Sequence, residues 1–298
     1  MKRGWKIFWI IISVIAGLGI VLSCVALGLG LSFRQIREAY PNGIGIVKEH
    51  TVEYKDDRDD DHEVYESTPS TDAVRYENVT RLEMRVGGCE VELLSSEDDA
   101  VWVDTSWLDA ERNGKSVEVQ SKSNEDGNGE TLVVQMTDGT GTSETLLDMI
   151  DDCEYGTLYV YLPKDRDLEE VDLTLGAVDM EGGELRAKTV RIESGAADCS
   201  IENLQTEELT ATVGAGNLEI EGAIRKNADV KCGVGNLELY LEGSKEDFNY
   251  TVKCGMGEVD IDEDIVFSGI GGSKKVDNGS SRNMTIDCGV GNVEVYFQ

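Results

Sequence analysis

The sequence predicts an all-β fold: a β-solenoid with coils of about 19 residues, preceded by one N-terminal transmembrane α-helix. Three observations predict it. An uncharged run fills residues 7–33, short alternating apolar and polar segments fill the C-terminal half, and a glycine recurs at one fixed place in each segment. Alternation with a period of two indicates strands that bury one face. A repeat of about 19 residues is too short for a helical-hairpin repeat.

The first 33 residues predict a short cytoplasmic N-terminus at 1–6 and a transmembrane helix at 7–33. The run from Ile7 to Phe33 contains no charged residue, and it exceeds the roughly 20 residues that a helix needs to span a bilayer. A cleaved signal peptide has a shorter apolar region. Basic residues before the run outnumber those just after it, which favours a cytoplasmic N-terminus. We therefore expect a single-pass protein of the cell membrane with an extracellular domain.

Two alternatives stay open for this apolar run. Cys24 follows VLS at 21–23 in the manner of a lipoprotein cleavage site, but the residues after it stay apolar, which suits a continuing helix better. Small residues recur at four-residue spacing, as at Gly19 and Ser23, and this pattern allows a homodimer through the transmembrane helix. Small residues also occur in membrane helices that have no such partner.

Residues 34–76 predict an acidic linker, and the chain as a whole is acidic. The run KDDRDDDHE at 55–63 is typical of a solvated segment. A calcium site is conceivable there, but the run lacks the ligand spacing and the turn glycine of an EF-hand loop. The formal net charge is -32. Such a charge argues against a nucleic-acid partner, because nucleic-acid binding needs lysine and arginine on the phosphates, and it favours basic partners.

The solenoid domain expected at 77–298 repeats one segment. Three alternating apolar positions precede a glycine, three short residues and a second alternating stretch, as in LTATVGAGNLEI from residue 209. Similar segments begin at 82, 171, 190, 228, 250 and 284, and those at 171, 190, 209 and 228 start 19 residues apart. Each buries its apolar side by stacking on the next. An insert at 108–156 and a Gly/Ser loop at 268–283 interrupt the pattern.

The fixed glycine of each segment predicts a corner of the coil, because a Cβ at that place would obstruct the backbone. The run GVG after Cys232 does not predict a phosphate-binding loop, since a strand and not a helix follows it. The structural corner glycines are Gly87, Gly176, Gly195, Gly214, Gly233, Gly255 and Gly289.

Three cysteines occupy the inward position just before that glycine, and we expect them to stack in consecutive coils. The favoured interpretation is an inward column of small buried thiols that pack as modest hydrophobes. A disulfide between two of them is the alternative, although a coil spacing of about 4.8 Å is somewhat long for one. A metal site needs about four ligands, and the chain has two histidines and no CxxC pair. The inward thiol column consists of Cys232, Cys254 and Cys288.

The stretch YVYLPKDRDLEEVDLTLGAVDMEGGEL and the units after it resemble the bacterial "putative adhesin" β-strand-repeat family, a domain of unknown function. The resemblance covers roughly residues 77–298 and is most specific over 157–298. It rests on the LP strand end, on units such as SGAADCSI and VGAGNLEI, and on the Gly-rich loop. It implies a β-solenoid displayed at the cell envelope on a membrane anchor of the Gram-positive type. The family label implies adhesion and establishes no ligand.

These observations predict a non-enzymatic, membrane-anchored cell-envelope surface protein whose solenoid is a binding or scaffold domain. We expect an envelope polymer, a protein or a cationic peptide as partner, and no cofactor or metal. An envelope-stress sensor that acts through a bilayer partner is one alternative, which the resemblance implies for some relatives. A carbohydrate-active enzyme is another, but the chain lacks the Gly-x-Ser-x-Gly and HExxH signatures, and we identify no catalytic residue.

Overall fold

The computed structural model describes residues 69–108, 115–138, 156–262 and 264–298. All of them belong to the second of two structural units, Glu63–Gln298. The transmembrane helix expected at 7–33 and most of the linker expected at 34–76 lie outside the described residues. Within the described ranges, no helix is both long and apolar enough to cross a membrane.

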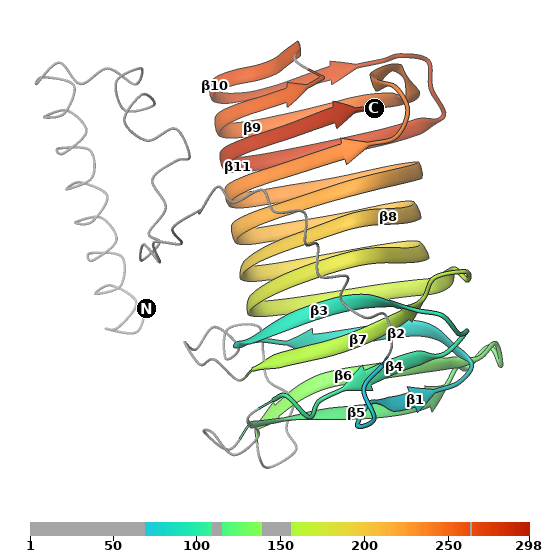
Figure 1. Ribbon diagram of the computed structural model, residues 1–298. Helices are drawn as coiled ribbons and strands as arrows, with labels where there is room; N and C mark the ends of the chain where they lie inside the picture. The colour runs from blue at the N-terminus through green and yellow to red at the C-terminus, as the bar shows by residue number, and fades with distance from the viewer. Residues whose placement is uncertain (1–68, 109–114, 139–155, 263) are drawn as a thin grey trace, which may run out of the picture. The chain divides into compact units, whose positions relative to one another are not determined.

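The described residues form an all-β fold in which strands stack in layers along one axis (Figure 1). The one described helix is a single 3-10 turn, η1 (Lys245–Asp247), capped by the Ser244 side chain. The strands are β1 (Val74–Tyr76), β2 (Val79–Val86), β3 (Cys89–Ser96), β4 (Val101–Asp104), β5 (Lys115–Ser123), β6 (Glu130–Asp138), β7 (Thr157–Pro163), β8 (Leu168–Leu241), β9 (Phe248–Ile261), β10 (Asp264–Val276) and β11 (Arg282–Phe297).

The 74-residue element β8 winds through successive coils, as Figure 1 shows. Side chains 19 residues apart meet across neighbouring coils: Arg186 Nε lies 3.0 Å from Asp167 Oδ1, and Lys226 Nζ lies 2.5 Å from Glu207 Oε2. The apolar side chains at alternate positions point inward and are buried, with exposures of a few per cent or less. The expected 19-residue solenoid coil is therefore present.

Each coil contains two strand segments that meet at a glycine-containing corner, and β2 and β3 form one such pair around Gly87 and Gly88. β2 pairs in parallel with residues 170–175 of β8, whereas β3 pairs in parallel with residues 178–182. We call the part of a coil before the corner its first segment and the part after it its second segment.

The layers do not follow the order of the chain at the N-terminal end. β2 pairs with β6 on the side away from β8, and β3 pairs with β7. β5 then adds to β6, β4 adds to β7 and β1 adds to β4, all antiparallel. The coil made of β2 and β3 is thus an internal layer, and β1 shows that the folded domain begins inside the linker expected at 34–76.

Strand insertion also occurs at the C-terminal end. β11 pairs in parallel with residues 227–241 of β8 on one side and with β9 on the other. The prediction that the last three repeats stack in chain order is therefore wrong, because the final repeat lies between the two that precede it. The prediction of a loop at 268–283 is also wrong over its first half, since β10 extends to Val276 and pairs antiparallel with β9.

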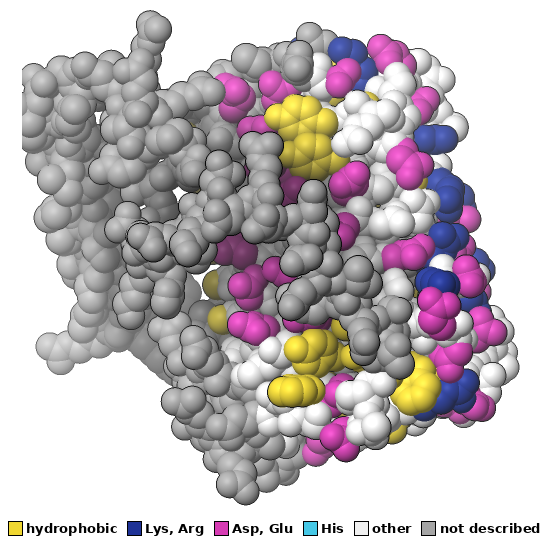
Figure 2. Space-filling view, in the orientation of Figure 1, with side chains coloured by type: hydrophobic (Ala, Val, Ile, Leu, Met, Phe, Trp, Pro, Cys, Tyr) yellow, Lys and Arg dark blue, Asp and Glu magenta, His cyan; other side chains and the backbone are white. Residues whose placement is uncertain are grey.

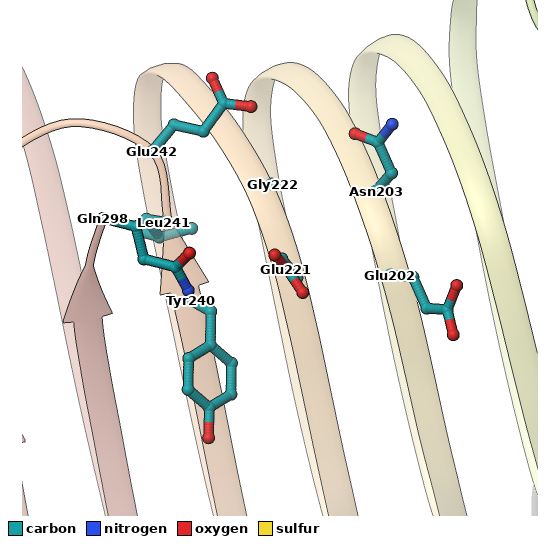
Figure 3. Close-up of a pocket in the computed structure, with 8 residues that line it drawn as sticks. All are labelled: Glu202, Asn203, Glu221, Gly222, Tyr240, Leu241, Glu242 and Gln298. Atoms are coloured by element: carbon teal, nitrogen blue, oxygen red, sulfur yellow. The ribbon is translucent and has the colours of Figure 1, made fainter. Parts of the chain in front are cut away.

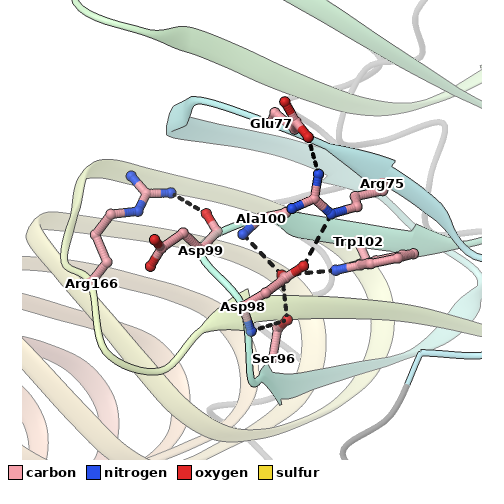
Figure 4. Close-up of polar contacts among 8 residues, drawn as sticks. All are labelled: Arg75, Glu77, Ser96, Asp98, Asp99, Ala100, Trp102 and Arg166. Atoms are coloured by element: carbon pink, nitrogen blue, oxygen red, sulfur yellow. Dashed lines mark hydrogen bonds and ion pairs between the residues drawn. The ribbon is translucent and has the colours of Figure 1, made fainter.

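A network of polar contacts closes the N-terminal layers (Figure 4). The Asp98 carboxylate accepts hydrogen bonds from Trp102 Nε1, the Ala100 amide, Arg75 Nε and Ser96 Oγ, at 3.0–3.1 Å. Burial opposes the charged form, but these donors outweigh it and lower the pKa of Asp98 to about 2. Ionised Asp98 therefore holds the β3–β4 turn against β1.

Candidate functional site

The predicted corner glycines form a column through the later coils. A Cβ built on Gly233 would lie 2.5 Å from the carbonyl oxygen of Gly214, and one on Gly289 would lie 2.5 Å from that of Gly233. Gly255 meets Gly289 in the same way. The close backbone approach, and not a ligand, explains why glycine recurs at this position.

A second glycine column, two residues further on, was missed from the sequence. Gly235 and Gly291 have φ of +143° and +146°, in the region that disfavours L side chains. A Cβ on Gly291 would lie 1.8 Å from the carbonyl oxygen of Gly235. The second glycine of each G-x-G run is the signal that could have found this column; its members are Gly216, Gly235, Gly257 and Gly291.

The structure brings the predicted thiol column together in a different order. Cys288 is in register with Cys232 on one side and with Cys254 on the other. All three side chains are buried, with exposures of 1–3%. Burial raises the pKa of the Cys254 thiol to about 11. These thiols face the core, so they are not available to a ligand at the surface.

The outer surface offers a different candidate site, formed by the second segments of the coils. Their outward positions carry carboxylates in register: Glu92 lies opposite Glu181, and Glu294 lies between Glu238 and Asp260. No lysine or arginine stands in the described second segments at 89–94, 178–183, 197–202, 216–221, 235–240, 257–261 and 291–296. We call this surface the carboxylate face; it comprises Glu90, Glu92, Asp179, Glu181, Asp198, Glu202, Glu219, Glu221, Glu238, Glu258, Asp260 and Glu294.

Burial and like-charge repulsion raise the pKa values of two carboxylates on this face. Burial and the neighbouring charges of Glu181 and Glu90 raise the pKa of Glu92. Burial and the charges of Asp198 and Glu90 raise the pKa of Asp179 in the same way. Like charges directly opposite each other on neighbouring strands destabilise a sheet. The like charges on this face therefore lower the stability of the domain and concentrate negative charge on one surface.

Several cations stand along the edge where each second segment leads into the next coil. Lys188 Nζ lies 2.7 Å from Glu169 Oε1 there, and the pairs Arg186–Asp167 and Lys226–Glu207 repeat the arrangement. Figure 2 shows lysine and arginine side chains along one edge, and acidic side chains without them nearer the middle of the view. The acids of these ion pairs are therefore neutralised by cations of the same domain.

Two tyrosines on the carboxylate face stack on each other. The rings of Tyr240 and Tyr296 have centroids 5.2 Å apart and planes 14° apart. Tyr240 donates a hydrogen bond of 2.9 Å to Glu238, and Tyr296 donates one to Glu294. The bond to Glu238, helped by burial, raises the pKa of Tyr240 to about 12. The pair thus presents aromatic surface beside two fixed carboxylates.

A shallow depression of about 280 Å³ lies beside Tyr240, where the second segments end (Figure 3). Glu202, Glu221 and Glu242 bring three carboxylates to it from consecutive coils. Gln205 Nε2 donates to Glu242 Oε1 at 3.2 Å and fixes one of them. Carboxylates next to an aromatic ring can bind an ammonium or guanidinium group, through charge-assisted hydrogen bonds and a cation–π contact.

Comparison with known proteins gives the family. The sequence matches the family described as Toastrack DUF4097 over residues 79–265. The chain belongs to this family. No curated protein matches the sequence.

Two solved structures resemble the Toastrack chain distantly. One is described as a "putative cell adhesion protein" from Clostridium sporogenes; it is 12% identical, covers 76% of this chain and 99% of its own, and has a TM-score of 0.38. The other is described as a "putative adhesin" from Bacteroides fragilis; it is 11% identical, covers 76% of this chain and 98% of its own, and has a TM-score of 0.28.

Repulsion on the carboxylate face of the Toastrack domain predicts a stabilising substitution. We expect Glu181→Gln to raise the free energy of unfolding by about 0.5 kcal/mol at pH 7, because it removes the charge opposite Glu92. The raised pKa of Glu92 means that the folded state binds protons more readily than the unfolded state, so the repulsion is present at neutral pH and disappears as the pH falls below about 4. The stabilisation by Glu181→Gln should disappear together with this repulsion.

Thermal denaturation at pH 7 and at pH 4 measures this effect. Glu184→Gln is the matched control, because Glu184 lies 3.5 Å from Arg186 and its loss should leave stability unchanged or slightly lower. If Glu181→Gln lowers the melting temperature as Glu184→Gln does, repulsion on the face is not significant.

Proposed function

We propose that this protein is a non-enzymatic, membrane-anchored protein of the cell envelope whose Toastrack domain binds a basic partner through its carboxylate face. The observation that carries the proposal is the face itself: carboxylates stand in register on neighbouring strands, and no lysine or arginine stands in its described strand segments. A partner bearing lysine or arginine would relieve this repulsion on binding.

Charge complementarity defines the class of partner. A surface of one sign attracts a ligand of the opposite sign over distances set by the ionic strength. Tyr240 and Tyr296 add aromatic surface that a lysine or arginine side chain can cover. The best fit is an extended, lysine- or arginine-rich peptide segment whose side chains reach several coils at once.

Membrane attachment is part of the same proposal, and the sequence supports it. The uncharged run at 7–33 would hold the chain in the cell membrane as a single pass with a cytoplasmic N-terminus. The domain would then stand outside the cell, where basic segments of proteins or peptides can reach it. In this proposal the protein acts by binding alone.

The test measures the affinity of the full-length protein, in detergent micelles, for a fluorescent lysine-rich peptide. We expect the triple variant Glu219→Gln, Glu238→Gln and Glu294→Gln to bind about tenfold more weakly, because three exposed charge pairs contribute on the order of 1.4 kcal/mol together. Raising the salt concentration should weaken wild-type binding and narrow the difference.

A matched control removes three carboxylates from outside the carboxylate face: Glu193, Glu208 and Asp287, which lie on first segments. This control variant has the same net charge as the test variant but keeps the carboxylate face intact. It should therefore bind the peptide nearly as tightly as the wild type. Equal weakening of both variants would show that net charge alone attracts the peptide. That result, or no binding by the wild type, would refute the proposal.

A further inference from the structure

The three core cysteines occupy equivalent places on three adjacent strands, with the last cysteine of the chain in the middle. β11 places Cys288 in register with Cys232 of β8 and with Cys254 of β9. Cys232 and Cys254 are therefore separated by a whole strand, although they are neighbours in the repeat pattern. Only pairs that include Cys288 are in adjacent strands.

The Cys288 side chain lies between those of Cys232 and Cys254 in the column. Its Sγ donates to the carbonyl oxygen of Gly291 at 3.4 Å, and interaction with Cys232, together with burial, raises its pKa. The described cysteines are all free thiols in this structure. Adjacent parallel strands place the Cα atoms of in-register residues about 4.8 Å apart, inside the range that disulfides span, although the Cβ atoms at about the same spacing are somewhat further apart than the roughly 3.8 Å usual in a disulfide. A bond therefore requires the two side chains to change rotamer and the two strands to move together by a few tenths of an ångström.

We propose that Cys288 is a shared disulfide partner, which bonds to either Cys232 or Cys254 and leaves the other as a free thiol beside the bond. The inserted strand β11 is then cross-linked to β8 or to β9. This goes beyond the proposed binding function and does not depend on it.

The chemistry balances with a small-molecule disulfide such as oxidised glutathione as the oxidant. Two protein thiols lose two protons and two electrons to form one S–S bond, and the oxidant is reduced to two thiols. The third cysteine can then exchange: its thiolate attacks Sγ of Cys288, a new S–S bond forms, and the former partner leaves as a thiolate. Three sulfur atoms in a column provide the in-line approach that this substitution requires.

Burial of the three thiols in the folded domain determines when the disulfide can form. The three side chains are 1–3% exposed in the folded domain, and burial raises the pKa of the Cys254 thiol to about 11. Few thiolates are present there and an oxidant has little access. The disulfide should therefore form while β11 inserts during folding, and it should exchange slowly afterwards.

The test refolds the full-length protein in detergent in a mixture of reduced and oxidised glutathione, quenches it with acid, alkylates free thiols and maps the linked peptides by mass spectrometry. We expect two products, a Cys232–Cys288 link with alkylated Cys254 and a Cys254–Cys288 link with alkylated Cys232. We expect no Cys232–Cys254 link. A Cys232–Cys254 link, or no link within the column, would overturn the proposal.

Cysteine-to-alanine variants test which pairs of cysteines form the disulfide. Cys288→Ala should abolish both links, while Cys232→Ala should leave only the Cys254–Cys288 link. Cys89→Ala is the matched control, because Cys89 is also buried but lies opposite Val178, and it should leave both products unchanged. The mapping on the wild-type protein decides the matter even if Cys288→Ala fails to fold.

Discussion

Gly291→Ala is expected to destabilise the Toastrack domain by more than about 3 kcal/mol, because the substitution combines backbone strain with overpacking. Gly291 has φ of +146°, and an added Cβ would lie 1.8 Å from the carbonyl oxygen of Gly235 and 3.1 Å from its nitrogen. β11 is held between β8 and β9, so it cannot move away from Gly235 without breaking pairing on its other side.

Chemical denaturation of the purified protein measures this loss. Gly183→Ala is the matched control, since the nearest atom to its added Cβ is the carbonyl oxygen of Leu93 at an ordinary 3.8 Å. We expect the control to change stability by less than about 1 kcal/mol. Similar stabilities for the two variants would mean that the second glycine column is not a packing constraint.

Deleting residues 282–298, which removes β11, is expected to release β9 and β10 from the solenoid. β11 provides the pairing between β9 and β8, and its buried residues include Met284, Ile286 and Val293. Without them, the core between the two strands opens to water and each buried aliphatic side chain loses about 1.5–3 kcal/mol of transfer free energy. We expect β8 to retain its coils up to about residue 222, because those pairings do not involve β11.

Hydrogen exchange followed by mass spectrometry reports this release strand by strand. Amides of β9 should exchange at rates close to those of an unfolded chain, whereas amides at 171–220 should stay protected. Deleting Gln298 alone is the control; it removes two backbone hydrogen bonds, to Leu241 and from Gly243, and should affect only the neighbouring residues. Full protection of β9 after deletion of β11 would show that β9 stacks directly on β8.

The sequence predicted the repeat but not the order of its layers. Alternation and spaced glycines are local signals, so the strands, their inward residues and the 19-residue coil followed from them. Register between strands is not local here, because Ala228-Asp229-Val230-Lys231-Cys232 and Met284-Thr285-Ile286-Asp287-Cys288 present the same inward pattern. Any of the later repeats could stack on any other by that pattern, and the insertion of β11 could not be deduced.

The carboxylate face could have been found from the sequence, whereas its aromatic part could not. Once the repeats are aligned, the outward positions after each corner are acidic in most repeats, as at Glu181, Glu219 and Glu238. Tyr240 and Tyr296 are 56 positions apart in the chain, and they meet only because β11 pairs with β8. The depression beside Tyr240 depends on the same arrangement.

Carboxyl footprinting tests the central claim most directly, because it labels the side chains that are proposed to bind. The full-length protein would be treated with a carbodiimide and an amine, with and without a saturating lysine-rich peptide, and labelling would be read by mass spectrometry. We predict that the peptide protects Glu219, Glu238 and Glu294 and leaves labelling of Glu193 and Glu208 unchanged. Protection of Glu193 and Glu208, with the carboxylate face still labelled, would contradict the account.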